Sequence, residues 1–130
     1  MNYLDTGILI SAIYLRDANQ ERCSALLKEG ITSTHALAEA FAALTGQYRV
    51  KNEIVSEAVL SLRGQLRIEP IFANDYFAVL GEVKGRGVMG GLVYDAIHAS
   101  VARRLKVERL YTFNVSNFEH VAPDLKVLAP

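Results

Sequence analysis

Three acidic side chains stand alone in otherwise uncharged and largely apolar stretches of the sequence. Each is the only charged side chain of its stretch: Asp5 within residues 1–15, Glu39 within 30–48 and Asp95 within 87–102. A carboxylate in a core element is costly unless another group pairs with it or coordinates to it. Because no lysine or arginine shares a stretch with any of the three, we predict that these acids have a chemical role.

The segments around the acids predict that they meet at one edge of a sheet. Asp5 follows a short apolar strand at the N-terminus, and Glu39 lies one turn into the helix after a second strand. Asp95 starts a later helix, and Asn114 follows a strand predicted near 110–112. In a parallel sheet covered by helices, the functional site lies at the carboxyl ends of the strands. We therefore expect three carboxylates and one amide oxygen to converge there.

Carboxylates that converge repel one another unless a hard cation neutralises them. Ligands that are all oxygen, with no Cys and no paired His, fit Mg²⁺ or Mn²⁺ better than zinc. Purely structural roles stay open for each residue at this stage: Asp5 as a helix cap, Glu39 in an ion pair with a distant arginine, Asp95 as a favourable charge at a helix N-terminus, and Asn114 in a turn.

Short strands alternate with helices along the chain, which predicts an α/β class with a central parallel sheet flanked by helices. One domain would span residues 1–130. Expected strands lie at 3–4, 31–33, 67–71, 109–112 and 126–128, and expected helices at 19–28, 35–45, 52–62, 74–83 and 92–105. Five glycines between positions 81 and 91 predict a flexible loop in that stretch.

Composition narrows the classes of function. Fourteen Lys and Arg balance 14 Asp and Glu, so binding of nucleic acid by bulk charge alone is not expected. Cys23 is the single cysteine, so nothing indicates an oxidising compartment. The N-terminus lacks a basic segment before an apolar run, and no stretch approaches eighteen apolar residues, which together predict a cytoplasmic protein.

Four segments, in their order and spacing, resemble the motifs of PIN-domain ribonucleases, most closely the VapC-type toxins of toxin–antitoxin modules. They are Tyr3-Leu4-Asp5-Thr6, Glu39 in an Ala-rich helix, Tyr94-Asp95-Ala96-Ile97-His98-Ala99, and the stretch 110–118. The resemblance implies a PIN-like fold with a sheet between helix layers, a divalent-metal site and endonucleolytic cleavage of RNA. The sequence departs from the family pattern at Gly7, where a polar residue is common, and at Asn114, where an aspartate is common.

The resemblance also implies roles for these residues. Asp5 and Asp95 would ligate Mg²⁺ or Mn²⁺, and Glu39 would complete the ligand set or orient a water whose pKa the ion lowers. Thr6 and Asn114 would be hydrogen-bonding groups around them. A cognate antitoxin would restrain the nuclease by placing a basic side chain among the acids. Apolar stripes near the N-terminus would support a homodimer.

Other interpretations remain open. His98 lies three residues after Asp95 on one helix face, so an Asp–His pair in a metal-free cleavage mechanism is possible, although a satisfied structural histidine is favoured. A non-catalytic protein-binding module or a receiver-like signalling domain is the alternative function. We expect the basic cluster at 103–109 to interact with the dipole of its own helix. Phosphate contacts would come from Arg49, Lys51, Arg63, Arg67, Lys84 and Arg86.

Overall fold

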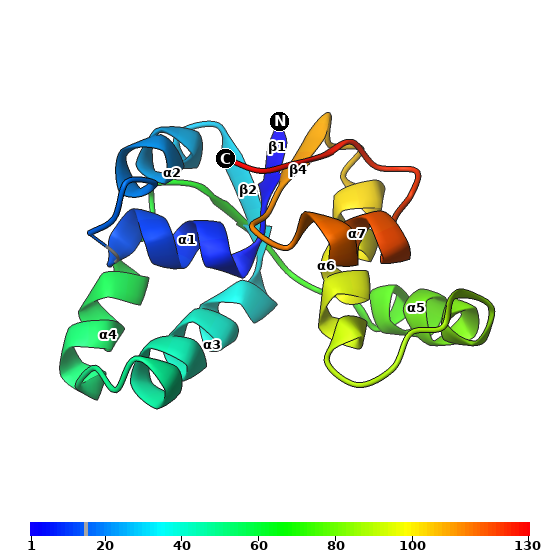
Figure 1. Ribbon diagram of the computed structural model, residues 1–130, viewed down its shortest axis with the longest axis horizontal. Helices are drawn as coiled ribbons and strands as arrows, with labels where there is room; N and C mark the ends of the chain where they lie inside the picture. Colours follow the sequence, from blue (N-terminus) through cyan, green and yellow to red (C-terminus); the bar gives the residue numbers. More distant parts are fainter. Residues whose placement is uncertain (15) are drawn as a thin grey trace.

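The computed structural model describes residues 1–14 and 16–130 of the chain. Its sheet consists of five short parallel strands in the order β3-β2-β1-β4-β5 (Figure 1). The strands are β1 (Asn2–Leu4), β2 (Gly30–Ser33), β3 (Arg67–Glu69), β4 (Arg109–Tyr111) and β5 (Val127–Leu128). The prediction of an α/β fold with a central parallel sheet is therefore confirmed.

Helices connect each pair of consecutive strands, because parallel strands need crossover connections. They are α1 (Thr6–Ile13), α2 (Gln20–Leu27), α3 (Thr34–Ala42), the π-helical turn η1 (Ala43–Gln47), α4 (Asn52–Leu60), α5 (Ala73–Arg86), α6 (Leu92–Arg104) and α7 (Val115–Val121). Most of the expected helices are present with ends shifted by a few residues. Helix α7 has no counterpart among the expected elements.

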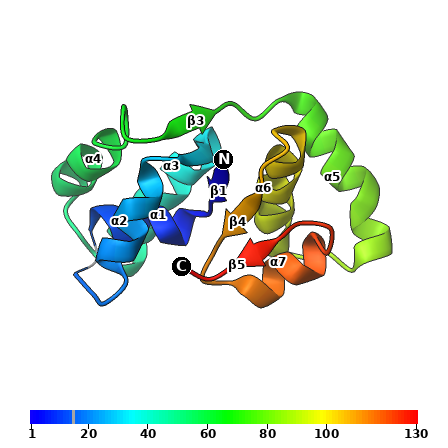
Figure 2. The same ribbon diagram turned by 90° about the horizontal axis from the view of Figure 1, so that it is seen from above.

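Two layers of helices cover the sheet, with α1 to α4 on one side and α5 to α7 on the other (Figure 2). Successive side chains of a strand point to opposite faces. Accordingly, Tyr3 packs in a core with residues of α5, α6 and α7, whereas Leu4 packs in a second core with residues of α1, α2 and α3. Both side chains are fully buried, so β1 anchors the two layers at the centre of the molecule.

The strand order places a topological switch point between β1 and β4. The chain leaves β1 to add β2 and β3 on one side, and later adds β4 and β5 on the other. In open parallel sheets, the crevice beyond the carboxyl ends of strands at such a point is the usual ligand site.

The strand order also differs from the 2-1-3-4-5 order typical of receiver-like sheets. The receiver-like alternative is therefore wrong.

The predicted loop at 81–91 is wrong over its first half. Gly81 and Gly85 lie inside α5, and Gly87 ends that helix with φ 63°. Glycine costs about 1 kcal/mol relative to alanine inside a helix, but Val79 of α5 is buried in the core that contains α6 and α7. Packing of this kind stabilises a helix more than intrinsic propensity does. Only residues 87–91 connect α5 to α6.

The apolar residues near the N-terminus do not form an exposed stripe, which corrects the expected dimer surface. Ile8, Leu9, Ile10 and Ala12 of α1 are at most 8% exposed, and Leu15 lies outside the described residues. Large apolar side chains are exposed elsewhere, notably Ile54 and Leu60 of α4 and Phe77 and Leu80 of α5. No helix in residues 1–14 and 16–130 is long and apolar enough to cross a membrane.

Candidate active site

Asp5 lies at the switch point, between the end of β1 and the start of α1. Its Oδ1 accepts the backbone N–H of Thr6 at 2.8 Å, so the expected role as a helix cap is confirmed. Its Oδ2 accepts the hydroxyl of Thr112 at 2.7 Å, and its own N–H donates to the carbonyl of Tyr111. The cap uses only one carboxylate oxygen, and the second is held toward β4. Asp5 is 5% exposed, so water shields this charge little.

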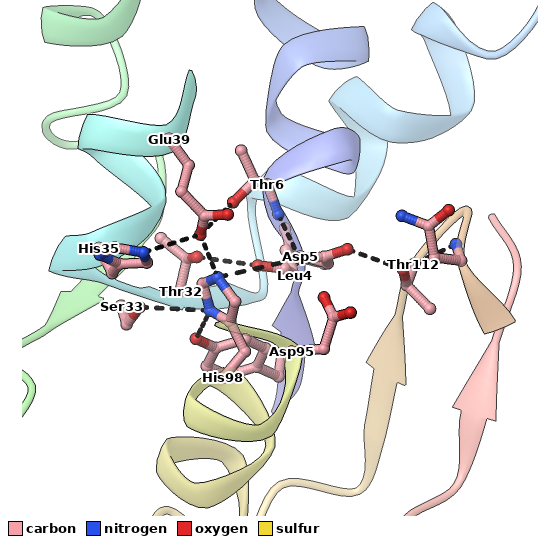
Figure 3. A network of polar contacts seen from close by, with 12 residues as sticks. Leu4, Asp5, Thr6, Thr32, Ser33, His35, Glu39, Asp95, His98 and Thr112 are labelled. Atoms are coloured by element: carbon pink, nitrogen blue, oxygen red, sulfur yellow. Dashed lines mark hydrogen bonds and ion pairs between the residues drawn. The ribbon is translucent and has the colours of Figure 1, made fainter. Parts of the chain in front are cut away.

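Glu39 lies on α3, which packs beside α1, and its side chain points toward Thr6 and His98 (Figure 3). Its Oε1 accepts hydrogen bonds from the Thr6 hydroxyl at 3.1 Å and from Nε2 of His98 at 2.5 Å. The Nε2 of His35, one helical turn before it, lies 3.7 Å from the same oxygen. No arginine of the described residues pairs with Glu39, so the expected structural alternative of an Arg–Glu pair is wrong. The partner is a histidine.

His98 is fully buried at the centre of this network. Its Nδ1 lies 2.6 Å from the Tyr3 hydroxyl and 3.4 Å from that of Ser33. Because carboxylate oxygens only accept, Nε2–H donates to Glu39 in either protonation state, and a neutral ring accepts the Tyr3 hydroxyl at Nδ1. His98 is therefore a satisfied histidine, as expected, but the carboxylate that it contacts is that of Glu39 rather than Asp95.

Asp95 enters from the opposite helix layer. Helix α6 begins at Leu92 rather than at Asp95, so the acid occupies its first turn and benefits from the helix dipole. Its Oδ2 accepts a hydrogen bond from the side-chain amide of Asn117 at 3.3 Å. The pKa of Asp95 is raised to about 6, chiefly because the side chain is partly buried and secondly because the negative charge of Asp5 is near. The two acids are thus close enough to interact electrostatically.

The charges of this group are mutually dependent. Burial raises the pKa of Asp5, even though His98 and hydrogen bonds from Thr112 and Thr6 oppose the effect. Burial also works against ionised Glu39, but the hydrogen bond and charge of His98 outweigh it and lower the pKa of Glu39. Conversely, although burial alone would lower it, these acids raise the pKa of His98. The surroundings therefore disfavour the charged forms of the two aspartates, whereas His98 favours the charged form of Glu39.

Asn114 contributes to the site through its backbone. Its N–H donates to Oγ1 of Thr112 at 2.9 Å, and that hydroxyl in turn donates to Asp5. Its side chain is exposed, and the amide that contacts Asp95 belongs to Asn117. Thr112 and Asn117 are therefore site residues that sequence reasoning missed. For Thr112, the available signal was a polar residue at the carboxyl end of a predicted strand. Asn117 lies on α7, a helix that was not predicted.

The donor set fits a divalent cation at Asp5 and Asp95. Their oxygens are hard ligands, and burial together with mutual repulsion disfavours their charged forms, which a cation would reverse. Glu39 differs from the two aspartates, because it accepts hydrogen bonds from both Thr6 and His98, and both go to its Oε1. Within the described residues, no three or more His, Cys, Asp or Glu side chains lie as close together as a metal site requires. Asp5 and Asp95 are close enough to interact electrostatically and Glu39 is hydrogen-bonded to His98, so a metal site of three carboxylates stays a prediction.

Three of the arginines form ion pairs with acids outside the site. Arg103 binds Asp124 with two hydrogen bonds of 2.7 and 2.8 Å, and Arg104 binds the buried Asp75 at 3.0 and 3.1 Å. These arginines tie α6 to other segments, so the expected interaction with their own helix dipole is not their main contact. Arg67 stands at the start of β3, the edge strand of the sheet, and pairs with Glu69. The expected phosphate contact of Arg67 stays a prediction.

Comparison with solved structures gives close overall agreement. VapC20 of Mycobacterium tuberculosis matches with a TM-score of 0.76 at 18% identity, over 100% of both chains. VapBC2 of Rickettsia felis matches with a TM-score of 0.75 at 23% identity, over 100% of this chain and 99% of that chain. VapBC-1 of nontypeable Haemophilus influenzae matches with a TM-score of 0.68 at 26% identity, over 99% and 98%. The arrangement of helices around the sheet is therefore that of VapC-type structures.

Sequence comparison is consistent with this likeness. No curated protein matches the chain significantly. The family model of the PIN domain matches residues 3–123, which include every acid of the site. The fold, the topological position of Asp5 and the family match agree with one another, and the chain belongs to the PIN domain family.

Proposed function

We propose that this chain is a single-domain, divalent-metal-dependent endoribonuclease that hydrolyses RNA phosphodiester bonds and acts as the toxin of a toxin–antitoxin pair. The observation that carries the proposal is the meeting of Asp5 and Asp95 at the switch point of a PIN-domain sheet, with Glu39 beside them. Two similar structures are described as a sarcin-ricin loop cleaving toxin and a toxin-antitoxin complex, which supports the same function here.

Asp5 and Asp95 would hold Mg²⁺ or Mn²⁺, with Glu39 as a third ligand or as the group that orients a water. When bound, such an ion neutralises charge that develops on the scissile phosphate and favours ionisation of the attacking water. The protein supplies the orientation of the ligands. Thr112 and the N–H of Thr6 fix the two oxygens of Asp5, and the buried ring of His98 fixes Oε1 of Glu39. Asn114 completes the proposed set as a hydrogen-bonding group at the rim.

The test is cleavage of mixed RNA by the purified protein with Mg²⁺, with Mn²⁺ and with EDTA. We expect cleavage with either ion and none with EDTA. Asp5→Asn and Asp95→Asn should each abolish cleavage while the protein stays folded. Glu57→Gln, which changes an exposed acid of α4 in the same way, is the matched control and should cleave normally. Activity that persists in EDTA and in both aspartate variants would overturn the proposal.

The metal-free alternative, in which histidines act as general acid and base, is disfavoured by the position of His98. General acid–base catalysis needs the ring within hydrogen-bond reach of the reacting atoms. His98 is fully buried, and both of its ring nitrogens contact other side chains. RNA products that end in a cyclic phosphate and form in EDTA would favour the alternative.

An antitoxin would inhibit the enzyme at the same group of acids. An arginine or lysine placed beside Asp5 and Asp95 would relieve their repulsion as a cation does. We expect the chain to be toxic when expressed alone and to be rescued by the small protein encoded beside it. The chain would also form a homodimer, which light scattering of the purified protein measures directly. Growth without the neighbouring protein would contradict the toxin function and leave the nuclease chemistry to be judged by cleavage.

A further inference from the structure

A hollow of about 330 Å³ lies along α1, and none of the three site acids Asp5, Glu39 and Asp95 lines it. Its lining residues come from α1, from the segment before α2, from the residue after η1 and from the residue after Thr112. They are Gly7, Ile10, Asp17, Asn19, Tyr48 and Phe113. Small-ligand pockets have volumes of roughly 300–1,000 Å³, so this hollow is at the lower end of that range. It can hold one planar ring system.

The hollow is connected to the acids by the backbone. Gly7 comes two residues after Asp5 in the first turn of α1. Phe113 directly follows Thr112, whose hydroxyl donates to Asp5 at 2.7 Å. A chain of nucleotides with its scissile phosphate at the acids would therefore place a neighbouring base near this hollow.

Phe113 can stand against α1 because residue 7 is glycine. A Cβ atom on Gly7 would lie 3.3 Å from Cδ2 of Phe113, closer than most such contacts. The phenyl ring thus packs directly on the helix backbone, yet Phe113 is 43% exposed. Gly7 is also a position at which the sequence departs from the pattern of its family. The absence of a side chain at Gly7 leaves room for the ring of Phe113 against α1.

The other lining residues suit an aromatic ligand with a polar edge. Tyr48 provides a second exposed aromatic side chain, and the buried Ile10 provides an apolar floor. Asp17 and Asn19 bring polar groups, and the segment that carries them is held by a hydrogen bond from the Asn19 N–H to Oδ1 of Asp17 at 2.9 Å. Apolar faces with a few convergent polar groups are the usual composition of a ligand pocket.

We propose that this hollow binds one nucleobase of the RNA strand, with its ring stacked on Phe113 and its polar edge directed toward Asp17 and Asn19. The inference rests on the proposed ribonuclease function and adds a base-binding subsite to it. Aromatic side chains bind single-stranded nucleic acid by stacking, because every base has a π-face. The subsite would position the strand relative to the acids.

The chain has no tryptophan, which makes a direct optical test possible. Phe113→Trp, combined with Asp95→Asn so that the RNA stays intact, places the only tryptophan of the protein in the hollow, where it can be excited at wavelengths at which tyrosine does not absorb. We expect adenosine or cytidine hexaribonucleotides to quench its emission, and an abasic hexamer with the same backbone to leave it unchanged. The matched control is Phe77→Trp in the same background. Phe77 is 68% exposed on α5, in the opposite helix layer, and its tryptophan should not respond to RNA.

Affinity and cleavage give the second measurement. Loss of one stacked base by Phe113→Ala should weaken RNA binding about 5- to 150-fold. The effect should raise KM more than it lowers kcat, and Phe113→Tyr should restore most of it. Gly7→Ala should have a smaller effect of the same kind by displacing the ring. Phe77→Ala should leave both constants unchanged.

The outcomes separate the subsite from the function. Normal cleavage and affinity in Phe113→Ala, with no RNA-dependent quenching in Phe113→Trp, would overturn the subsite and leave the ribonuclease proposal intact. Quenching by the antitoxin but not by any RNA hexamer would also overturn it, in favour of a protein side chain as occupant. Wild-type protein that cleaves no RNA and binds none would instead refute the ribonuclease function on which the subsite rests.

Discussion

The hydroxyl of Thr112 donates to Oδ2 of Asp5 at 2.7 Å and thereby joins the carboxyl ends of β4 and β1 across the switch point of the sheet. The two residues are 107 positions apart in sequence. The same hydroxyl accepts the N–H of Asn114. One fully buried side chain therefore orients the acid of the first strand and the segment that leads into α7.

Thr112→Val should destabilise the protein, because valine keeps the shape of threonine but leaves a buried carboxylate oxygen and a backbone N–H without their partner. Loss of such a buried partner costs about 1–3 kcal/mol. Urea unfolding at pH 7 measures the change. Thr112→Ser keeps the hydroxyl and should lose less. Equal stability of the valine variant and the wild type would mean that this hydrogen bond does not hold Asp5.

Asp95→Asn should stabilise the metal-free protein near neutral pH. The pKa of Asp95 is raised to about 6, so the folded state binds its proton more tightly than the unfolded state does. Stability from this group is therefore fully present below the ordinary pKa of 3.8 and is lost as the pH rises through about 6. An uncharged asparagine at position 95 does not ionise, so this loss of stability with rising pH is absent in the variant. Because the side chain is partly exposed, the gain should be modest, about 1 kcal/mol.

Thermal unfolding at pH 4 and at pH 7.5 in EDTA measures this difference. The two proteins should have similar melting temperatures at pH 4, and the variant should be higher at pH 7.5. Glu57→Gln, at an exposed position on α4, should have the melting temperature of the wild type at both pH values. A lower melting temperature of Asp95→Asn at pH 7.5 would mean that Asp95 serves chiefly as a favourable charge at its helix N-terminus.

The positions of the acids could be predicted because the cause is local. Asp5 interrupts an apolar segment at its carboxyl end, and parallel strands bring such ends to one edge. The same logic located Glu39 and Asp95. Sequence could not supply the partner of Glu39, since His98 is 59 residues away and a histidine in an apolar helix fits a core role equally well. Tertiary packing decides which atoms the ring meets.

The errors in the fold have a similar origin. Gly81 and Gly85 disfavour a helix locally, but burial of Val79 against the α6–α7 layer overrides that preference. In α1, an apolar run adjacent to the terminus was interpreted as a surface for a second copy, whereas the central place of β1 requires α1 to be covered. Both errors arise where tertiary packing, which local sequence does not encode, determines what is buried.

Tyr3→Phe should loosen His98 without removing any acid. The Tyr3 hydroxyl lies 2.6 Å from Nδ1 of His98 and is fully buried, so its loss leaves the ring nitrogen with only the distant Ser33 hydroxyl. We expect a stability loss of about 1–2 kcal/mol and a several-fold lower cleavage rate, because Glu39 is then less firmly oriented. Tyr111→Phe, on the neighbouring strand, is the control for loss of a tyrosine hydroxyl. Unchanged cleavage in Tyr3→Phe would show that His98 needs no support from Tyr3.

Divalent ions should stabilise the folded protein, and the effect should depend on both aspartates. A ligand that binds only the folded state adds about 2.7 kcal/mol at a free concentration one hundred times its Kd. Melting temperatures measured against Mn²⁺ concentration should therefore rise in the wild type and stay flat in Asp5→Asn and Asp95→Asn. Glu39→Gln should reduce the rise less than either aspartate variant does, since the hydrogen bond and charge of His98 already stabilise the Glu39 carboxylate. A rise of wild-type size in both aspartate variants would place the ion elsewhere on the protein and remove Asp5 and Asp95 as its ligands.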